Sequence, residues 1–457
     1  MKTSRRDFLK GASVASLWAA GGCAGFPAIT SVRSPNALLN HACIGTGNMA
    51  NYDMYQFLEN GNVHIAALCD VDAEYLAKAG KAVKGARLYR DWRELLEKEG
   101  DRIDSVNVST PDHTHACIIS AALCAGKHVY SQKPLCKFFD ENARLAQLAA
   151  ESGKVTQLGT QCAAFRTDRT CVALLRSGVL GPVRNLRLYS NRTGRSRVER
   201  TVPVPCAVPA KLDWNLWLGP AAERPYAEGY HPLLWRMYTD FGTGWIGDLC
   251  IHVISAPWQG LNLGEAAPLS VRADVNAEAL VNPAYKGCWP RYSHIVWEMP
   301  GVRASGMKPF RMEWLSGFAN DPSVPKEFLP EKGVFKEIPL QGRIIETELA
   351  WVVVDHCYDE TNGIQIVMKD GSTPPPLPEL GPAPSHFDDF VDKCIQGGTP
   401  RSSFAWASKM MDAVLMGGIA ERLPGRTHLW NAATRTFDTP DANRLARSNY
   451  RTGWSLA

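Results

Sequence analysis

The sequence predicts an α/β domain with a doubly wound parallel sheet, followed by an α+β domain with a large, mostly antiparallel sheet. Up to about residue 160, apolar runs alternate with helical patterns of about 10–15 residues, which indicates a parallel sheet. A glycine turn, Gly45-Thr46-Gly47, joins the first apolar run to the first helix. Beyond Gln161, stretches with a period of two follow one another with few helices between them, which is typical of an antiparallel sheet.

The first elements have the form of a dinucleotide-binding, or Rossmann, unit. A strand over 37–44 leads into the turn, and a helix then runs to Glu59. The first glycine allows a tight turn, and the second lets a pyrophosphate approach the backbone at the helix N-terminus. A second strand, 63–69, ends in Asp70, where a carboxylate would bind the adenosine ribose and repel a 2′-phosphate. The pattern therefore favours NAD over NADP, and the alternative is a plain α/β turn with a helix-capping Asp.

The alternation continues through the rest of this domain. Further helices are predicted over 72–82, 91–98, 112–125 and 140–151, and further strands over 103–108, 127–130 and 155–158. Lys133 follows the strand 127–130, and ligands bind at the carboxyl ends of strands in open α/β sheets. Lys133 is therefore expected to reach both cofactor and substrate, and the alternative is a solvated lysine beside a turn.

The second half is expected to hold most of the antiparallel strands. The predicted helices there are 168–176, 386–395 and 407–422, and the predicted strands are 183–189, 269–275, 292–298, 310–314, 350–355 and 364–368. Two proline-rich stretches, 203–209 and 374–384, are predicted to be irregular connections. We divide the chain into an export signal (1–35), an NAD-binding domain (36–165), a substrate and oligomerisation domain (166–385) and C-terminal helices with a tail (386–457).

The N-terminus has the pattern of a twin-arginine export signal. Arg5 and Arg6 precede a weakly apolar, glycine-broken run to Thr30, which is a poor membrane span. The prediction is a periplasmic or otherwise exported protein that engages the twin-arginine export machinery, with no transmembrane helix in its mature form. The alternatives are a membrane anchor, a chance arginine pair, or lipidation at Cys23, where the leucine usual three residues earlier is missing.

Charge and cysteine content narrow the class of protein. The formal charge is +4, of which Lys2, Arg5, Arg6 and Lys10 against Asp7 supply +3, so no nucleic acid partner is expected. The 13 cysteines have no spacing that suggests a disulfide framework or a zinc site, which suits folding in a reducing cytoplasm before export. An exported nicotinamide enzyme cannot easily exchange its cofactor, so we expect it to hold and regenerate the cofactor within each turnover.

Six motifs occur in the order and spacing of a known family. They are Gly45-Thr46-Gly47, Asp70, Ser109-Thr110-Pro111-Asp112-His113-Thr114-His115, Gly126-Lys127-His128-Val129, Gln132-Lys133-Pro134 and Gly159-Thr160-Gln161. From about residue 38 to Trp454 the chain resembles the Gfo/Idh/MocA (glucose-fructose oxidoreductase, inositol dehydrogenase, rhizopine catabolism) family. The family's usual Glu-Lys-Pro is Gln-Lys-Pro here, so Gln132 keeps a carbonyl acceptor and lacks the negative charge.

The resemblance implies an NAD-dependent oxidoreductase whose second sheet packs against partner subunits, and hence a homodimer or homotetramer. The expected cofactor-binding residues are Gly45, Thr46, Gly47, Asn48, Met49, Asp70, Ser109, Thr110, Pro111, His113, His115, Gln132, Lys133 and Gln161. His113 and His115 lie two apart on a predicted helix, which is poor spacing for metal ligands. A capping or nucleotide-contact role is favoured for both, and no metal site is predicted.

Asp248 and His252 are the other predicted catalytic residues, beside Lys133. On a helix that begins near Asp248 they would be i and i+4 and share a face. Spacing alone favours a structural role, with Asp248 as a helix cap and His252 as a core histidine, whereas the resemblance to the family's Asp-x-x-x-His pair favours catalysis. Alcohol oxidation sends a hydride to the nicotinamide and a proton to a base. We predict His252 as that base, Asp248 as its orienter or a hydroxyl ligand, and Lys133 as the group that polarises the oxygen or shares the proton.

Sugar recognition combines aromatic platforms with polar side chains, and Tyr230, Trp235 and Arg236 are the predicted substrate residues. The predicted function is NAD-dependent oxidation of a secondary hydroxyl on a sugar or sugar derivative. One alternative is a glycosidase or epimerase that works by transient oxidation and elimination. A sugar-binding protein with a vestigial cofactor site is the third reading, and only Gln132 hints at it.

Overall fold

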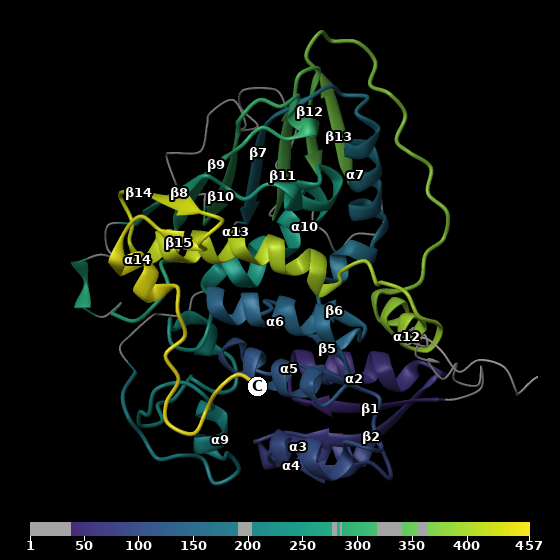
Figure 1. The fold of residues 1–457 in the computed structure, drawn as a ribbon, viewed down its shortest axis with the longest axis vertical. Coiled ribbons are helices and arrows are strands. Elements are labelled where there is room, and N and C mark those ends of the chain that lie inside the picture. The colour runs from purple at the N-terminus through teal and green to yellow at the C-terminus, as the bar shows by residue number, and fades with distance from the viewer. Residues whose placement is uncertain (1–37, 191–202, 277–280, 284–285, 318–340, 355–362) are drawn as a thin grey trace, which may run out of the picture. The chain divides into compact units, whose positions relative to one another are not determined.

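Two sheets, a six-stranded parallel one and a nine-stranded mixed one, organise the residues that the structure describes (Figure 1). In this computed structural model those residues are 38–190, 203–276, 281–283, 286–317, 341–354 and 363–457. The predicted export signal, with its arginine pair and Cys23, lies outside the described residues. Residues Leu38–Ala457 belong to one compact unit.

The first sheet has the strand order β3-β2-β1-β4-β5-β6, with every neighbouring pair parallel. Its strands are β1 (Leu39–Ile44), β2 (Val63–Cys69), β3 (Arg87–Tyr89), β4 (Ser105–Val108), β5 (His128–Ser131) and β6 (Thr156–Leu158). The chain runs outward from β1 to β3 and then returns to β4, so the order reverses between β1 and β4. Ligands of open α/β sheets bind in the crevice at such a reversal. The predicted doubly wound parallel sheet is confirmed.

Helices connect these strands. They are α2 (Met49–Glu59), α3 (Ala73–Ala82), α4 (Trp92–Glu99), α5 (Asp112–Cys124) and α6 (Phe139–Ser152). Asp72 and Asp91 cap α3 and α4, because each carboxylate accepts hydrogen bonds from amides of the first helical turn. The sequence prediction missed one element of this domain, β3. That strand is only three residues long and mostly exposed, so it has no apolar run to reveal it.

The second sheet has the order β13-β12-β11-β7-β10-β9-β8-β14-β15, and only the pair β7 and β10 is parallel. Its strands are β7 (Val183–Ser190), β8 (Ser270–Val275), β9 (Ser293–Met299), β10 (Phe310–Ser316), β11 (Gln341–Thr347), β12 (Ala350–Val354), β13 (Ile364–Met368), β14 (Thr427–Asn431) and β15 (Thr436–Phe437). The predicted, mostly antiparallel sheet is confirmed. The sequence prediction did not include β11, β14 and β15.

The remaining helices lie before and between these strands and at the C-terminal end. They are η1 (Gln161–Ala164), α7 (Arg166–Ser177), α9 (Trp214–Leu218), η2 (Leu234–Met237), η3 (Ile246–Cys250), α10 (Ile251–Gly260), η4 (Leu263–Glu265), η6 (Arg303–Ser305), α12 (His386–Gln396), α13 (Phe404–Arg422) and α14 (Pro440–Leu445). Helix α13 contacts α6 beside the first sheet and β8 of the second, so it joins the two layers (Figure 1).

The C-terminal tail packs along the segment that follows residue 203. Arg451 donates hydrogen bonds to the carbonyl oxygens of Gly219 and Asn215, and Ser448 donates to Asp140 of α6. The stretches 203–209 and 374–384 form no helix or strand, as predicted, apart from one isolated bridge at Pro205. The tail therefore braces an irregular segment that lacks a sheet of its own.

Three observations apply only within the described ranges. No helix there combines the length and the apolar character needed to cross a membrane. No group of three or more His, Cys, Asp or Glu side chains there is arranged to hold a metal ion. The 11 cysteines of these ranges are free thiols, and seven of them are buried.

Candidate active site

A cavity of about 480 Å³ opens at the carboxyl ends of the parallel strands, and residues between 216 and 252 form its other wall. Fifteen of the residues predicted from the sequence line it. They are Gly45, Gly47, Asn48, Met49, Asp70, Ser109, Thr110, Pro111, Gln132, Lys133, Gln161, Trp235, Arg236, Asp248 and His252. The predicted cofactor, catalytic and substrate residues therefore share one cavity, of the size that binds small ligands in proteins.

The glycine turn leaves the backbone open to this cavity. Gly45 has φ 93°, and a side chain on it would clash with the carbonyl oxygen of Ser109. Helix α2 begins at Met49 without a side-chain cap, and Asn48, Met49 and Ala50 all line the cavity. The uncapped amides at a helix N-terminus bind phosphate through their N–H groups and the helix dipole. This end of the cavity fits the pyrophosphate of a dinucleotide.

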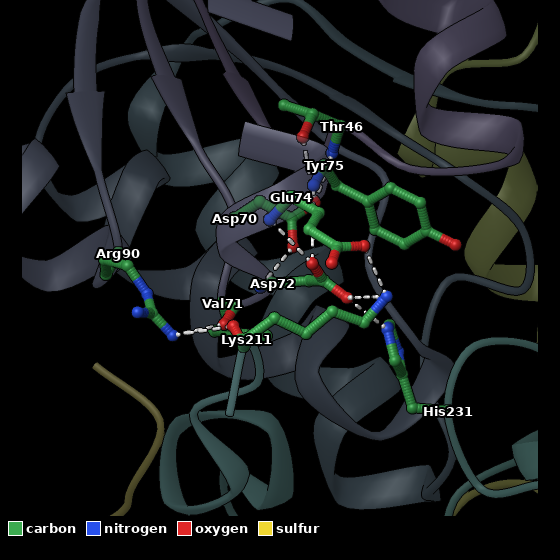
Figure 2. Close-up of polar contacts among 9 residues, drawn as sticks. All are labelled: Thr46, Asp70, Val71, Asp72, Glu74, Tyr75, Arg90, Lys211 and His231. Atoms are coloured by element: carbon green, nitrogen blue, oxygen red, sulfur yellow. Dashed lines mark hydrogen bonds and ion pairs between the residues drawn. The ribbon is translucent and has the colours of Figure 1, made fainter. Parts of the chain in front are cut away.

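Asp70 is held rigidly at the end of β2 (Figure 2). Its Oδ2 accepts hydrogen bonds from the Thr46 amide at 2.8 Å and hydroxyl at 3.0 Å, and its Oδ1 accepts one from the Asp72 amide at 2.9 Å. Burial raises the pKa of Asp70, and these three bonds oppose the shift. A carboxylate offers about four acceptor sites, so capacity remains for a ribose hydroxyl. Thr46 does not line the cavity, and its role is to orient Asp70.

A segment of the second part of the chain is fastened to the loop after β2 (Figure 2). The carbonyl oxygen of Lys211 accepts a hydrogen bond from the Ala73 amide at 2.9 Å, and the carbonyl oxygen of Val71 accepts one from the Asp213 amide at 3.1 Å. The Arg90 guanidinium donates to the carbonyl oxygens of Val71 and Lys211 at 2.7 and 3.3 Å. These bonds fix residues 211–213 close to Asp70, at the end of the cavity predicted to hold the adenosine, which we call the nucleotide end.

Side chains complete this fastening around the buried Asp72. His231 Nε2 lies 3.0 Å from Asp72 Oδ2, and Lys211 Nζ lies 3.7 Å from the same oxygen. Lys211 also donates to Glu74 at 2.7 Å, and the rings of His231 and Tyr75 meet edge to face at 5.8 Å. Residues 231–237 line the cavity. The loop that carries His231 therefore covers the nucleotide end.

The other end of the cavity holds the three residues predicted to be catalytic, and we call it the reacting end. It lies at the tip of β5, three strands from β2 in the sheet and so about 14 Å away. Lys133 Nζ donates to the carbonyl oxygen of Asp248 at 2.8 Å and to its Oδ1 at 2.5 Å. Arg236, which lies over the Trp235 ring at 4.2 Å, has its Nε 3.7 Å from the same oxygen. Burial alone would raise the pKa of Asp248, but the charges of Lys133 and Arg236 lower it to about 2. Asp248 is therefore an ionised anchor for both cations.

The helix that carries Asp248 and His252 differs from the prediction. It begins at Ile246 with a π-helical stretch, Ile246–Cys250, before the regular α10. The wider π turn does not place i and i+4 above one another as an α-helix does. The hydrogen bonds of Asp248 accordingly come from Lys133, while Nδ1 of the buried His252 lies 3.4 Å from Cys162 Sγ. The contact with Cys162, which lies 90 residues away in the chain, was not predicted.

Besides Thr46, three predicted residues lie outside the cavity lining: His113, His115 and Tyr230. Tyr230 is buried in an aromatic cluster, stacked on Trp214 with ring centroids 5.9 Å apart, so its predicted contact with substrate does not match its position. His113 Nε2 lies 3.0 Å from the carbonyl oxygen of Trp217, and burial lowers the pKa of His113 to about 3.

His115 connects two loops of the site from behind. Its Nδ1 lies 2.7 Å from the carbonyl oxygen of Pro134, and its Nε2 lies 2.8 Å from that of Thr110. Both histidines therefore shape the site without reaching into it. Several lining residues were not predicted, and these include Tyr75, Arg90, Trp92, Asp112 and His231. They lie partly on the helices α3, α4 and α5 and partly in irregular segments, and no periodicity marks any of them as part of a site.

The fold and the cavity define a class of protein, the two-domain dinucleotide-binding oxidoreductases. Residues 39–160 match the family model described as "Oxidoreductase family, NAD-binding Rossmann fold", and residues 175–293 match "Oxidoreductase family, C-terminal alpha/beta domain". Together the two matches cover just over half of the chain. The chain belongs to the Gfo/Idh/MocA oxidoreductase family, and NAD is the cofactor of its first domain.

Individual relatives are more distant. The chain is 31% identical over 194 residues to a "Glycosyl hydrolase family 109 protein" of Solibacter usitatus, a match that covers 39% of this chain and 44% of the relative. A "Levoglucosan dehydrogenase" of Pseudarthrobacter phenanthrenivorans is 26% identical over 194 residues, 41% of this chain and 40% of the relative. The matched region thus spans less than half the length of either curated relative.

One solved structure shows the shared fold. An inositol dehydrogenase homolog of Azotobacter vinelandii, in complex with NADH and myo-inositol, superimposes with a TM-score of 0.56 at 17% identity. The match covers 86% of this chain and 98% of that protein.

Proposed function

We propose that this protein oxidises a secondary hydroxyl of a sugar or sugar derivative with its NAD. The observation that carries the proposal is the convergence of Lys133, Asp248 and His252 on the cavity whose other end has the glycine turn and Asp70. Aromatic and cationic side chains, Trp235 and Arg236, line the cavity beside them. This combination suits a ligand with several hydroxyl groups.

The chain's own residues then divide the chemistry. Bound NAD⁺ supplies the hydride acceptor. Lys133, held as a donor by two hydrogen bonds to Asp248, polarises the alcohol oxygen. His252 accepts the hydroxyl proton, since imidazole exchanges protons near neutral pH. The bond to Cys162 fixes the ring orientation. A positioned base of this kind contributes about 10²- to 10⁴-fold to the rate.

We also propose that the cofactor stays bound and is recycled within each turnover, with the hydride of NADH passing to a carbonyl group, either of a second substrate or of the oxidised intermediate itself. The fastening of residues 211–213 and His231 to the loop after β2 supports this, because it would have to open for a nucleotide to leave. The test is to purify the protein, denature it and identify what is released. We expect about one NAD(H) per chain, and protein that carries and binds no dinucleotide would refute the redox proposal.

A second candidate is a glycosidase or epimerase that oxidises a ring carbon transiently, so that the neighbouring C–H becomes acidic, and then returns the hydride. The relatives named as glycosyl hydrolase family 109 proteins favour it. Release of p-nitrophenol from p-nitrophenyl glycosides without net NADH would establish this activity. Formation of about one bound NADH per chain without release of p-nitrophenol would establish the oxidoreductase instead. A non-catalytic sugar-binding role fits poorly with a lysine, a carboxylate and a histidine in one cavity.

We further propose export by the twin-arginine route and a homo-oligomeric state. Arg5 and Arg6 support the first, and replacing both with lysine should leave the protein in the cytoplasm. The large second sheet, which the family resemblance assigns to subunit contacts, supports the second. Analytical ultracentrifugation should give the mass of a dimer or tetramer, and a monomer at micromolar concentration would contradict the proposal.

A further inference from the structure

A buried carboxylate lies directly behind the cavity residue Gln132. Asp53, on α2, is fully buried, and both of its oxygens accept from Gln132 Nε2, at 3.0 and 2.9 Å. Its Oδ2 also accepts from the Ser109 hydroxyl at 2.7 Å. No Lys, Arg or His in the described part of the chain lies within 4 Å of this carboxylate as an ion-pair partner. A buried carboxylate without a direct ion-pair partner is costly even when it is hydrogen-bonded, so its place behind a cavity residue calls for a reason.

The bonds from Gln132 fix the orientation of its amide. Because Nε2 of Gln132 faces Asp53, its Oε1 faces the other way and accepts a hydrogen bond from the Lys133 amide at 3.3 Å. Gly159 makes room for this arrangement, since a Cβ on Gly159 would lie 3.1 Å from Gln132 Oε1. Gln132 thus presents a carbonyl oxygen as a carboxylate would, with the carboxyl group of Asp53 one hydrogen bond behind it.

The neighbours of Asp53 do not neutralise that charge. The Ser109 hydroxyl accepts a hydrogen bond from the Asn107 amide, and Oδ1 of Asn107 lies 3.0 Å from His41 Nε2. Burial lowers the pKa of His41 to about 4. Burial raises the pKa values of the titratable groups Cys43, Tyr52 and Tyr130. All four groups are therefore uncharged near pH 8. The cation that acts on Asp53 is Lys133, and its positive charge lowers the pKa of Asp53.

We propose that Asp53 is a positioning residue that supplies, through Gln132, the negative charge usually carried by a glutamate at position 132, and that it favours the oxidised, cationic nicotinamide. This inference rests on the proposed function only in requiring bound NAD. A carboxylate near the ring stabilises NAD⁺ relative to the neutral ring of NADH, so it lowers the midpoint potential of the bound couple. Asp53 and Gln132 together should then replace a single glutamate.

The test is a redox titration of the holoenzyme at pH 8, following absorbance at 340 nm against dyes of known potential. Burial raises the pKa of Asp53 to about 7, which is still below pH 8, so the carboxylate is mainly ionised in this titration. Asp53→Asn should raise the equilibrium ratio of bound NADH to bound NAD⁺ by about tenfold, which equals a rise of about 30 mV in the midpoint potential. The double variant Asp53→Asn/Gln132→Glu restores a carboxylate at position 132 and should return to within about twofold of the wild type.

Two further variants separate this effect from a loss of fold. Gln132→Glu alone places two carboxylates side by side, so it should lower the melting temperature without shifting the couple toward NADH. Glu99→Gln removes a buried carboxylate that pairs with Arg87, and it should leave the potential unchanged. A wild-type potential in Asp53→Asn, or no recovery in a folded double variant, would overturn the inference. Wild-type protein without nucleotide would instead overturn the proposed function.

Discussion

The two ends of the cavity are built in different ways. At the nucleotide end, the binding groups come from one short stretch: the amides of the turn, and Asp70 oriented by Thr46 and Asp72. At the reacting end, Lys133 and Asp248 meet across 115 residues, and each depends on the other. The binding groups of the nucleotide end are local in the sequence, whereas the reacting end is assembled from distant segments. Mutations should therefore affect binding at one end and turnover at the other.

The largest expected effect is at the reacting end. Lys133→Ala and His252→Ala should each lower hydride transfer by at least about a hundredfold, because each removes a group that acts on the alcohol oxygen in the proposed mechanism. Single-turnover absorbance at 340 nm measures this, and nucleotide content should stay normal. Lys98→Ala, which removes an exposed lysine paired with Glu94, is the matched control. Near-normal turnover in both site variants would refute the assignment.

At the nucleotide end, Gly45→Ala should reduce bound nucleotide by about tenfold or more, because the new side chain meets the Ser109 carbonyl and the backbone has φ 93°. Nucleotide released from equal amounts of folded protein measures the effect. Gly61→Ala is the control, since nothing lies within 4 Å of its added Cβ. Equal nucleotide content in the two variants would mean that the turn does not bind the pyrophosphate.

The reacting end should also make stability depend on pH. Burial raises the pKa of Asp53 to about 7 in the folded state, so the folded protein binds the proton more tightly than the unfolded chain. Protonated Asp53 therefore contributes to the free energy of unfolding below pH about 4. This contribution, at most about 4 kcal/mol, is lost as the pH rises to about 7. Urea unfolding of wild type and Asp53→Asn across this range measures the difference. A difference that stays constant between pH 4 and 7 would contradict the shift.

The smallest effect is expected where the loop covers the nucleotide. His231→Ala removes one hydrogen bond to Asp72, worth about 1 kcal/mol, so bound NAD(H) should dissociate about fivefold faster. Trapping released nucleotide with an excess of a competing dehydrogenase gives the rate. His64→Ala, at an exposed position of β2, is the control. An unchanged rate would mean that this contact does not retain the cofactor.

The same contrast explains what could be predicted from the sequence. The parallel sheet, the turn and the placement of Lys133 follow from local patterns, and the structure confirms the two sheets. Strand β11 was missed because its buried face begins with Gln341 and Arg343, and the burial of Arg343 depends on an ion pair with the distant Asp168. Tyr230 was assigned to substrate because an aromatic side chain suits a sugar, but the same property suits a core.

The partners at the reacting end could not be predicted either. A π turn displaces Asp248 from the regular helical spacing, and no local pattern marks it. The bond between His252 and Cys162, and the carboxylate of Asp53 behind Gln132, are contacts between segments far apart in the chain. Such contacts follow from tertiary packing, which sequence periodicity does not specify.

The most direct test of the account is to add sugars and polyols to oxidised holoenzyme and follow the bound nucleotide at 340 nm. We predict that a substrate reduces about one NAD per chain in the wild type, and that Lys133→Ala and His252→Ala keep the nucleotide but fail to reduce it at a comparable rate. Reduction at the wild-type rate in both variants would contradict the claim that these two side chains act on the reacting hydroxyl.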